Sequence, residues 1–81
     1  MAYKISIEYC VPWNYTPRAL SLEGAFRKEF TDIISDIELI PSDGGAYEIR
    51  VNGDLIYSKL ETGQHADPPE ILELFKEHIK E

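Results

Sequence analysis

The first residues of the chain alternate between apolar and polar side chains from position 3 to position 9. A period of two residues is typical of a β-strand that buries one face. We therefore predict a strand over residues 3–9. Its apolar face consists of Tyr3, Ile5, Ile7 and Tyr9.

A helical period replaces this alternation after position 16. Thr16-Pro17 combines a side chain favoured at a helix N-cap with the residue best tolerated at the first helical position, so we expect a helix to begin there. Gly24 lies inside this helix at a cost of about 1 kcal/mol relative to alanine, which predicts that another backbone passes close to it. The apolar stripe of the helix consists of Ala19, Leu22, Phe26 and Phe30.

Three further strands follow from alternation and turn residues. Residues 33–40 predict a strand that ends at Pro41, and residues 47–51 predict the next one. Asn52-Gly53 is a strong signal for a hairpin turn, because both residues tolerate positive φ. It predicts a last strand over residues 54–59.

A second helix is expected near the end of the sequence. Asp67 and Glu70 have the spacing of a capping box, with two prolines between them in the first turn. The inward side chains of this helix are Ile71, Leu72, Phe75 and Ile79.

These elements predict an α/β fold of two layers in the order β-α-β-β-β-α. Two strands joined through a helix are almost always parallel, and a hairpin is antiparallel, so the four-stranded sheet should be mixed. Each helix has one apolar stripe, which places both helices on one face of the sheet and leaves the other face, with its alternating acidic residues, in solvent. We expect residues 1–81 to form a single domain, because two cores would each be too small.

Charge and composition narrow the possible partners. Eight basic against fifteen acidic residues give a net charge of −7, which disfavours nucleic acid and anionic lipid as partners. No apolar run approaches the ~20 residues that span a bilayer, and the first residues do not resemble a signal peptide. The single cysteine excludes an intramolecular disulfide and agrees with a reducing compartment, so we expect a cytoplasmic protein.

Cys10 and Trp13 are the residues of this sequence with the most chemical interest. Cys10 follows the first strand, where α/β folds commonly place their sites, but free cysteines are also among the most buried residues. Trp13 can either pack in the core or anchor a partner protein. His65 and His78 have no metal-ligand spacing to Cys10, so we expect no metal site.

Several segments together resemble the selenoprotein W-like, or Rdx, family: residues 7–13, Arg18-Ala19, residues 43–49 and residues 51–59. The resemblance implies a thioredoxin-like fold with a Cys-x-x-Cys or Cys-x-x-selenocysteine motif after the first strand. Cys10 matches the first cysteine of that motif, and Trp13 stands where the second redox residue belongs. Gly63-Gln64-His65-Ala66 departs from the glycine, aromatic and proline that the family commonly has there.

Two functions are therefore open. A dithiol mechanism is excluded, because it needs a second thiol to attack the mixed disulfide. In the first hypothesis, Cys10 is a catalytic monothiol that forms a mixed disulfide with glutathione or a protein partner, which requires an exposed sulfur. In the second, the scaffold is a non-catalytic binding module whose partner-binding residues are Val11, Pro12, Trp13 and His65, which requires an exposed Trp13. Neither function calls for a resident cofactor, and the oligomeric state is left open.

Overall fold

The computed structural model of the chain describes residues 2–80. Its elements are β1 (Tyr3–Cys10), α1 (Thr16–Glu29), β2 (Ile34–Ser42), β3 (Tyr47–Val51), β4 (Asp54–Ser58), α2 (Lys59–Thr62) and α3 (Pro68–Ile79). Apart from the short α2, this is the predicted order of elements. Within these residues, no helix has the length and apolar character that crossing a membrane requires.

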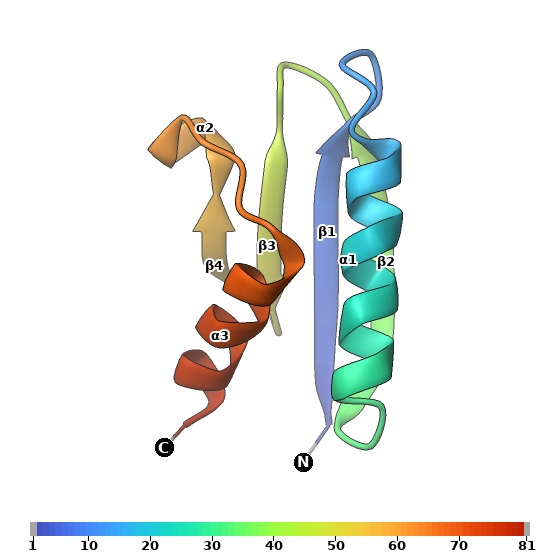
Figure 1. Cartoon of the computed structure of the whole chain (residues 1–81), viewed down its shortest axis with the longest axis vertical. Coiled ribbons are helices and arrows are strands. Elements are labelled where there is room, and N and C mark those ends of the chain that lie inside the picture. The colour runs from blue at the N-terminus through green and yellow to red at the C-terminus, as the bar shows by residue number, and fades with distance from the viewer. Residues whose placement is uncertain (1, 81) are drawn as a thin grey trace.

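The four strands form one mixed sheet in the order β2-β1-β3-β4. β1 pairs with β2 in parallel and with β3 in antiparallel fashion, and β3 pairs with β4 in antiparallel fashion. Figure 1 shows α1 and α3 side by side over one face of this sheet. The predicted two-layer α/β fold with both long helices on one face is confirmed.

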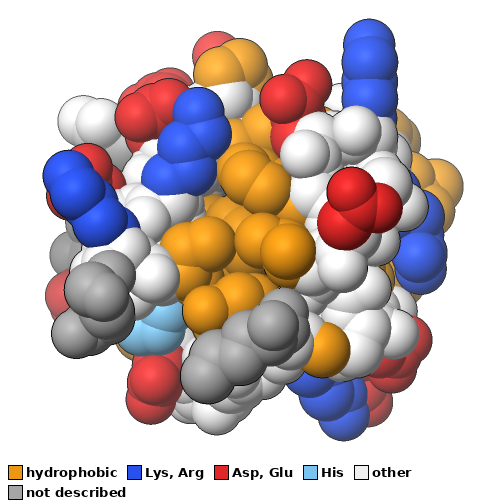
Figure 2. All heavy atoms as spheres, turned by 90° about the horizontal axis from the view of Figure 1, so that it is seen from below, with side chains coloured by type: hydrophobic (Ala, Val, Ile, Leu, Met, Phe, Trp, Pro, Cys, Tyr) orange, Lys and Arg blue, Asp and Glu red, His pale blue; other side chains and the backbone are white. Residues whose placement is uncertain are grey.

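The core lies between the sheet and the two long helices. Phe75 of α3 is fully buried, and its ring meets those of Tyr3, Phe26 and Phe30 edge-on, with centroids 5.8, 5.3 and 4.8 Å away. Figure 2, a view onto the end where α1 and α3 finish, shows apolar side chains reaching the surface between charged ones. The other fully buried side chains of the helices and central strands are Ile5, Ile7, Cys10, Ala19, Leu22, Phe26, Tyr47, Ile49, Val51 and Ile71.

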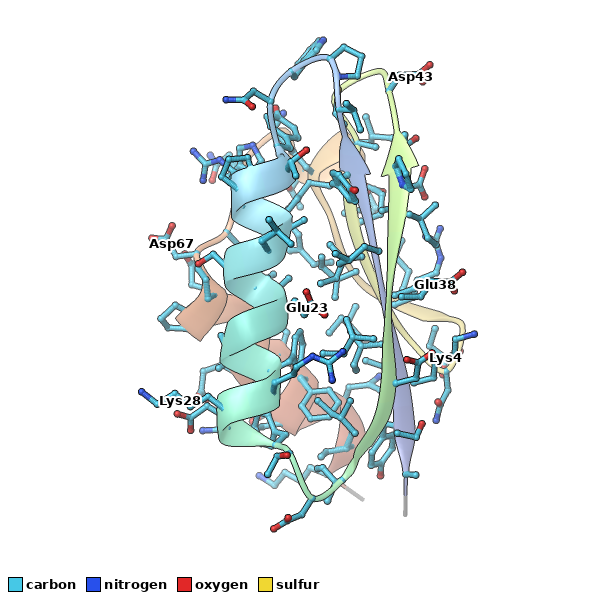
Figure 3. All side chains as sticks on the ribbon, turned by 90° about the vertical axis from the view of Figure 1, so that its right-hand side faces the viewer. Lys4, Glu23, Lys28, Glu38, Asp43 and Asp67 are labelled. Carbon is cyan, nitrogen blue, oxygen red and sulfur yellow. The ribbon has the colours of Figure 1, made fainter. Side chains whose placement is uncertain are left out.

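The opposite face of the sheet carries charged side chains. Lys4 and Glu38 point away from α1 (Figure 3), with their Nζ and Oε1 atoms 3.6 Å apart. Arg50 and Glu8 form a second pair on neighbouring strands, with Nη1 and Oε1 3.4 Å apart. The prediction of a solvated outer face holds for these residues and fails at Glu48, which is only 6% exposed.

The predicted ends of the strands need two corrections. Pro41 does not end β2 but pairs with Tyr9 inside it. This is possible because β2 is an edge strand, where a missing N–H breaks no ladder on the outer side. At the opposite edge of the sheet, β4 stops at Ser58, because Lys59 already begins α2.

Two predictions about α1 are also corrected. Its N-cap is Tyr15, without a capping side-chain hydrogen bond, and Thr16 is already helical. Gly24 is exposed, and a Cβ built on it would meet nothing within 4 Å. The predicted close approach of another backbone to Gly24 is therefore wrong, and we find no packing reason for a glycine there.

Candidate functional site

Three loops and α2 gather at the end of the sheet where β1 finishes (Figure 1). The loop over residues 11–15 is fixed by its own backbone, since the N–H of Asn14 donates to the carbonyl of Val11 at 2.9 Å and that of Tyr15 donates to Cys10 at 3.0 Å. The N–H of Val11 donates to the carbonyl of Ser42 on β2 at 3.0 Å. The segment that contains Cys10 and Trp13 is thus a hydrogen-bonded turn.

Cys10 is completely buried at the end of β1. Its N–H donates to the carbonyl of Ala46 at 2.8 Å and its carbonyl accepts from Tyr15, so loops on both sides hold it. Its side chain lies outside the cluster that forms the main core. The exposed sulfur that a monothiol mechanism needs is not present in this conformation.

Trp13 shows the opposite exposure. Its side chain is 58% exposed, Val11 is 47% exposed, and Pro12 between them is exposed too. We call these three residues the Trp13 patch. They are the sequence-predicted partner residues that the structure does bring together at the surface.

The indole of Trp13 rests on Gly45. A Cβ at position 45 would lie 2.8 Å from Cζ3 of the indole, closer than real Cβ contacts allow. Gly45 also has a φ of +80°, a conformation that favours glycine. The indole of Trp13 therefore packs directly on the backbone of the loop between β2 and β3, and this contact holds the ring at the surface.

A chain of rings continues from Trp13 into the protein. The ring of Tyr15 lies 6.1 Å from that of Trp13 and 4.3 Å from that of His65, centroid to centroid. His65 also meets Tyr47 at 5.0 Å. His65 was predicted to belong to the partner-binding surface, but both of its ring nitrogens are buried and have no hydrogen-bond partner among residues 2–80. The ring of His65 packs between those of Tyr15 and Tyr47.

Burial also fixes the protonation of these inner rings. Desolvation lowers the pKa of His65, and the positive charges of Arg18 and Lys59 lower it further. Burial raises the pKa of Tyr47 to about 12, against the opposing effect of Arg18. Both side chains are therefore neutral near pH 7.

Two cations lie beside these aromatic rings. Nζ of Lys59 lies 5.8 Å from the ring centroid of Trp13 and 5.7 Å from that of Tyr15, within the range of a cation–π interaction. Arg18 lines a pocket of about 260 Å³ together with Tyr47 and Asp67. The prediction that Lys59 belongs to the last strand is wrong, and it overlooked Ser58-Lys59-Leu60-Glu61, which has the spacing of a helix N-cap.

Glu48 attaches α2 to the sheet. Its buried carboxylate accepts hydrogen bonds from the hydroxyl of Ser58 and, at 3.3 Å, from the N–H of Leu60 in α2. The Ser58 oxygen accepts in turn from the N–H of Glu61 at 3.0 Å. A residue predicted to be solvated is thus the anchor of α2, and through α2 it positions Lys59.

The comparison with known proteins agrees with this fold. The Rdx family model matches residues 4–77. Migration and invasion enhancer 1 of Mus musculus is 35% identical over 72 residues, and that of Bos taurus is 33% identical over 73 residues. These alignments cover 89% and 90% of this chain but only 61% and 62% of the relatives, so the chain spans about three fifths of their length.

Solved structures are similar over their whole length. The selenoprotein W-related protein from Vibrio cholerae has a TM-score of 0.91 and 25% identity, with 99% of this chain and 100% of that chain covered. A protein from Bordetella parapertussis, at 20% identity, has the same fold with a TM-score of 0.90, covering 98% and 100% of the two chains. The family match over residues 4–77, together with this fold, shows that the chain belongs to the Rdx family of selenoprotein W-like, redox-related proteins with a thioredoxin-like fold.

Proposed function

We propose that this chain acts as a protein-binding module and that the Trp13 patch is its contact surface. One observation carries the proposal. In the segment that corresponds to the family's redox motif, the reactive Cys10 is buried and the unreactive Trp13 is exposed. Cys10 is 0% exposed and Trp13 is 58% exposed. A reagent or partner arriving from solvent meets the indole and not the thiol.

The indole suits such a role physically. Tryptophan is enriched among the residues that dominate binding energies, because it removes a large apolar area from water and still offers an N–H donor. Gly45 beneath the ring and Tyr15 beside it hold Trp13 in place before binding. Less conformational entropy is then lost when a partner docks.

Monothiol chemistry at Cys10 is the second candidate, and membership of a redox-related family favours it. The thiolate of Cys10 would attack the glutathione sulfur of a glutathionylated partner protein, forming a mixed disulfide between Cys10 and glutathione and releasing the partner's thiolate. A second glutathione would then restore the thiol and carry away glutathione disulfide. This route requires the loops around Cys10 to open, because the sulfur is buried. A cytoplasmic location, expected from the single cysteine, suits either function and stays a prediction.

Capture experiments with three immobilised variants separate the two functions. We expect Trp13→Ala to abolish capture of protein partners from cell extract, while Cys10→Ser leaves capture unchanged. Leu20→Ala is the matched control, since Leu20 is 52% exposed on α1 but lies outside the patch. Each captured protein is then purified and retested for direct binding. Loss of capture in Cys10→Ser alone would support the redox function instead.

Thiol reactivity gives an independent measurement. The native protein is exposed to oxidised glutathione over a range of pH, and intact mass is followed with time. We expect slow or absent adduct formation in the native state and rapid formation after unfolding in urea. A rapid single adduct on the native protein would contradict a structural role for Cys10 and favour the monothiol.

A further inference from the structure

Half of the cations in this acidic chain are paired with carboxylates. Among residues 2–80 the ion pairs of lysine and arginine are Lys4–Glu38, Arg27–Glu23, Arg50–Glu8 and Lys76–Glu73. Of the eight lysines and arginines, four therefore form no ion pair with a described residue. These four are Arg18, Lys28, Lys59 and Lys80.

Two of these four cations are stabilised by the ends of the helices in which they lie. Lys28 lies in the last turn of α1 and Lys80 is the C-cap of α3, where the partial negative charge of the helix end stabilises a cation. Arg18 lies in the first turn of α1, where that interaction is unfavourable, and this turn contains no acidic residue. Lys59 lies over the rings of Trp13 and Tyr15. Arg18 and Lys59 are thus the two cations that neither a carboxylate nor the end of a long helix stabilises.

Both of these cations belong to the end of the molecule that carries the Trp13 patch. Arg18 lines a pocket with Tyr47, whose ring lies 5.0 Å from that of His65, and Nζ of Lys59 lies 5.7 Å from the ring of Tyr15. Lys59 reaches Trp13 itself. Residues 11–22, which include the patch, contain no aspartate or glutamate in a chain that has fifteen of them.

Four carboxylates do lie at this end, and two of them are the buried Glu48, which accepts from Ser58 and Leu60, and Glu61 of α2. Of the other two, Asp43 lies in the loop after β2 (Figure 3), and Asp67 lines the pocket of Arg18 and caps α3. None of the four forms an ion pair with Arg18 or Lys59. Both cations therefore remain able to bind an anion that arrives from outside.

We infer that the segment bound at the Trp13 patch is an acidic stretch of a partner protein, in which an apolar side chain is flanked by aspartate or glutamate. The apolar side chain packs on Trp13 and Val11, and the carboxylates bind Arg18 and Lys59. Arginine and lysine form charge-assisted hydrogen bonds with carboxylates, and these bonds are stronger than neutral ones. The inference rests on the proposed binding function and adds the chemistry of its partner.

The local field can be measured on the protein alone, because Trp13 is its only tryptophan. Fluorescence quenching by iodide and by caesium ions is compared, each scaled to neutral acrylamide. We expect iodide to be the better quencher in spite of the net charge of −7, and the order to reverse in the double variant Arg18→Gln, Lys59→Gln. Lys28→Gln, at the far end of α1, should change little. Better quenching by caesium in the wild type would show that the four carboxylates at this end dominate, and would overturn the inference.

Partner chemistry is tested with three fluorescein-labelled peptide pools that share one central leucine or tryptophan. Its flanking residues are Asp and Glu in the first pool, Ser and Gly in the second, and Lys in the third. We expect the acidic pool to bind more tightly than the others, and its binding to weaken about tenfold in the double variant and on raising salt. Fluorescence anisotropy is the readout, with Trp13→Ala as the reference for non-specific binding.

The outcomes separate this inference from the proposed function. Binding that depends on Trp13 but is equal for the neutral pool, or stronger for the basic pool, would overturn the acidic partner and leave the binding module intact. Equal signals from wild type and Trp13→Ala in every pool would overturn the inference, and with a failed capture experiment also the proposed function. Analytical sedimentation of the wild type and of Trp13→Ala tests whether a second copy of this chain occupies the Trp13 patch. If the wild type dimerises and Trp13→Ala does not, the partner is a second copy and the acidic segment is ruled out.

Discussion

The two ends of this small sheet differ in how their polar groups are paired. At the end with the β3–β4 turn, Asn52 exchanges hydrogen bonds with the backbone of Lys4 at 2.9 and 2.8 Å, and Phe75 gathers three other rings around it. At the end with the Trp13 patch, the two buried ring nitrogens of His65 have no hydrogen-bond partner among residues 2–80, and Arg18 and Lys59 are stabilised neither by a carboxylate nor by the end of a long helix. The first end pairs the backbone of Lys4 with Asn52, whereas the second leaves the ring nitrogens of His65 without a hydrogen-bond partner among the described residues.

This difference indicates where the fold is stabilised and where it is available for function. Buried polar groups without partners and unpaired charges lower stability, and proteins retain them mainly at functional sites. The same end exposes a large aromatic side chain. Four substitutions test the division, from the largest expected effect to the smallest.

Phe75→Ala should be the most damaging of these changes. It removes a fully buried ring from the aromatic cluster, and we expect the free energy of unfolding to fall by about 3–5 kcal/mol. Urea denaturation followed by circular dichroism measures it. Should the alanine variant not fold, Phe75→Leu gives a smaller, measurable loss of about 1–2 kcal/mol. A loss no larger than that of the exposed control Leu20→Ala would contradict the location of the core.

Glu48→Ala should be next, with a loss of about 1–3 kcal/mol, because it leaves the Ser58 hydroxyl and the Leu60 N–H without their acceptor. The effect should be local, so that amide hydrogen exchange at Leu60 and Glu61 accelerates more than exchange in α3. Glu38→Ala is the matched control, since that glutamate forms an exposed ion pair, with about 0–1 kcal/mol expected. Unchanged exchange in α2 would show that Glu48 does not anchor it.

His65→Phe should raise the free energy of unfolding by about 1 kcal/mol near neutral pH, because it replaces two buried ring nitrogens that lack hydrogen bonds by apolar carbons. The gain should increase as the pH falls. The folded pKa of His65 is lowered, so the unfolded state binds the proton first, and the wild type loses stability below about pH 6.5 until the folded pKa is reached. Urea denaturation at several pH values measures both effects, with His78→Phe as control. A gain that is constant with pH would contradict the burial of His65.

Trp13→Ala should have the smallest effect on stability, a change of about 1 kcal/mol or less, because most of the ring lies in solvent. The comparison with Glu48→Ala is the informative one. If Trp13→Ala destabilised the protein as much, the indole would be a packing residue, and the binding function would lose its main support. Thermal unfolding of the purified variants provides the measurement.

Sequence patterns predicted the regular parts of this fold well, because their signals are local. The Asn52-Gly53 turn has the predicted positive φ at both residues, 51° and 91°. The capping box was predicted from spacing, and the Glu70 carboxylate accepts from the N–H of Asp67 at 3.2 Å. In each case the residues that determine the geometry lie within four positions of one another.

The features that escaped prediction depend on residues far apart in the sequence. α2 has a local cap, in which Ser58 accepts from the N–H of Glu61, but its attachment to the sheet depends on the buried Glu48, which accepts from the N–H of Leu60 twelve positions later. The exposures of Cys10 and Trp13 depend on the loop after β2, through Ala46 and Gly45. The sequence therefore identified the segment that forms the candidate site, and only the tertiary fold could show which of its residues faces solvent.

Gly45 also determines which side chains position 13 can hold. Its φ of +80° favours glycine whatever stands at position 13, so the space that the indole fills does not depend on the tryptophan. Both a small side chain and the indole fit over this glycine, so an exchange between them at position 13 needs no second substitution at position 45.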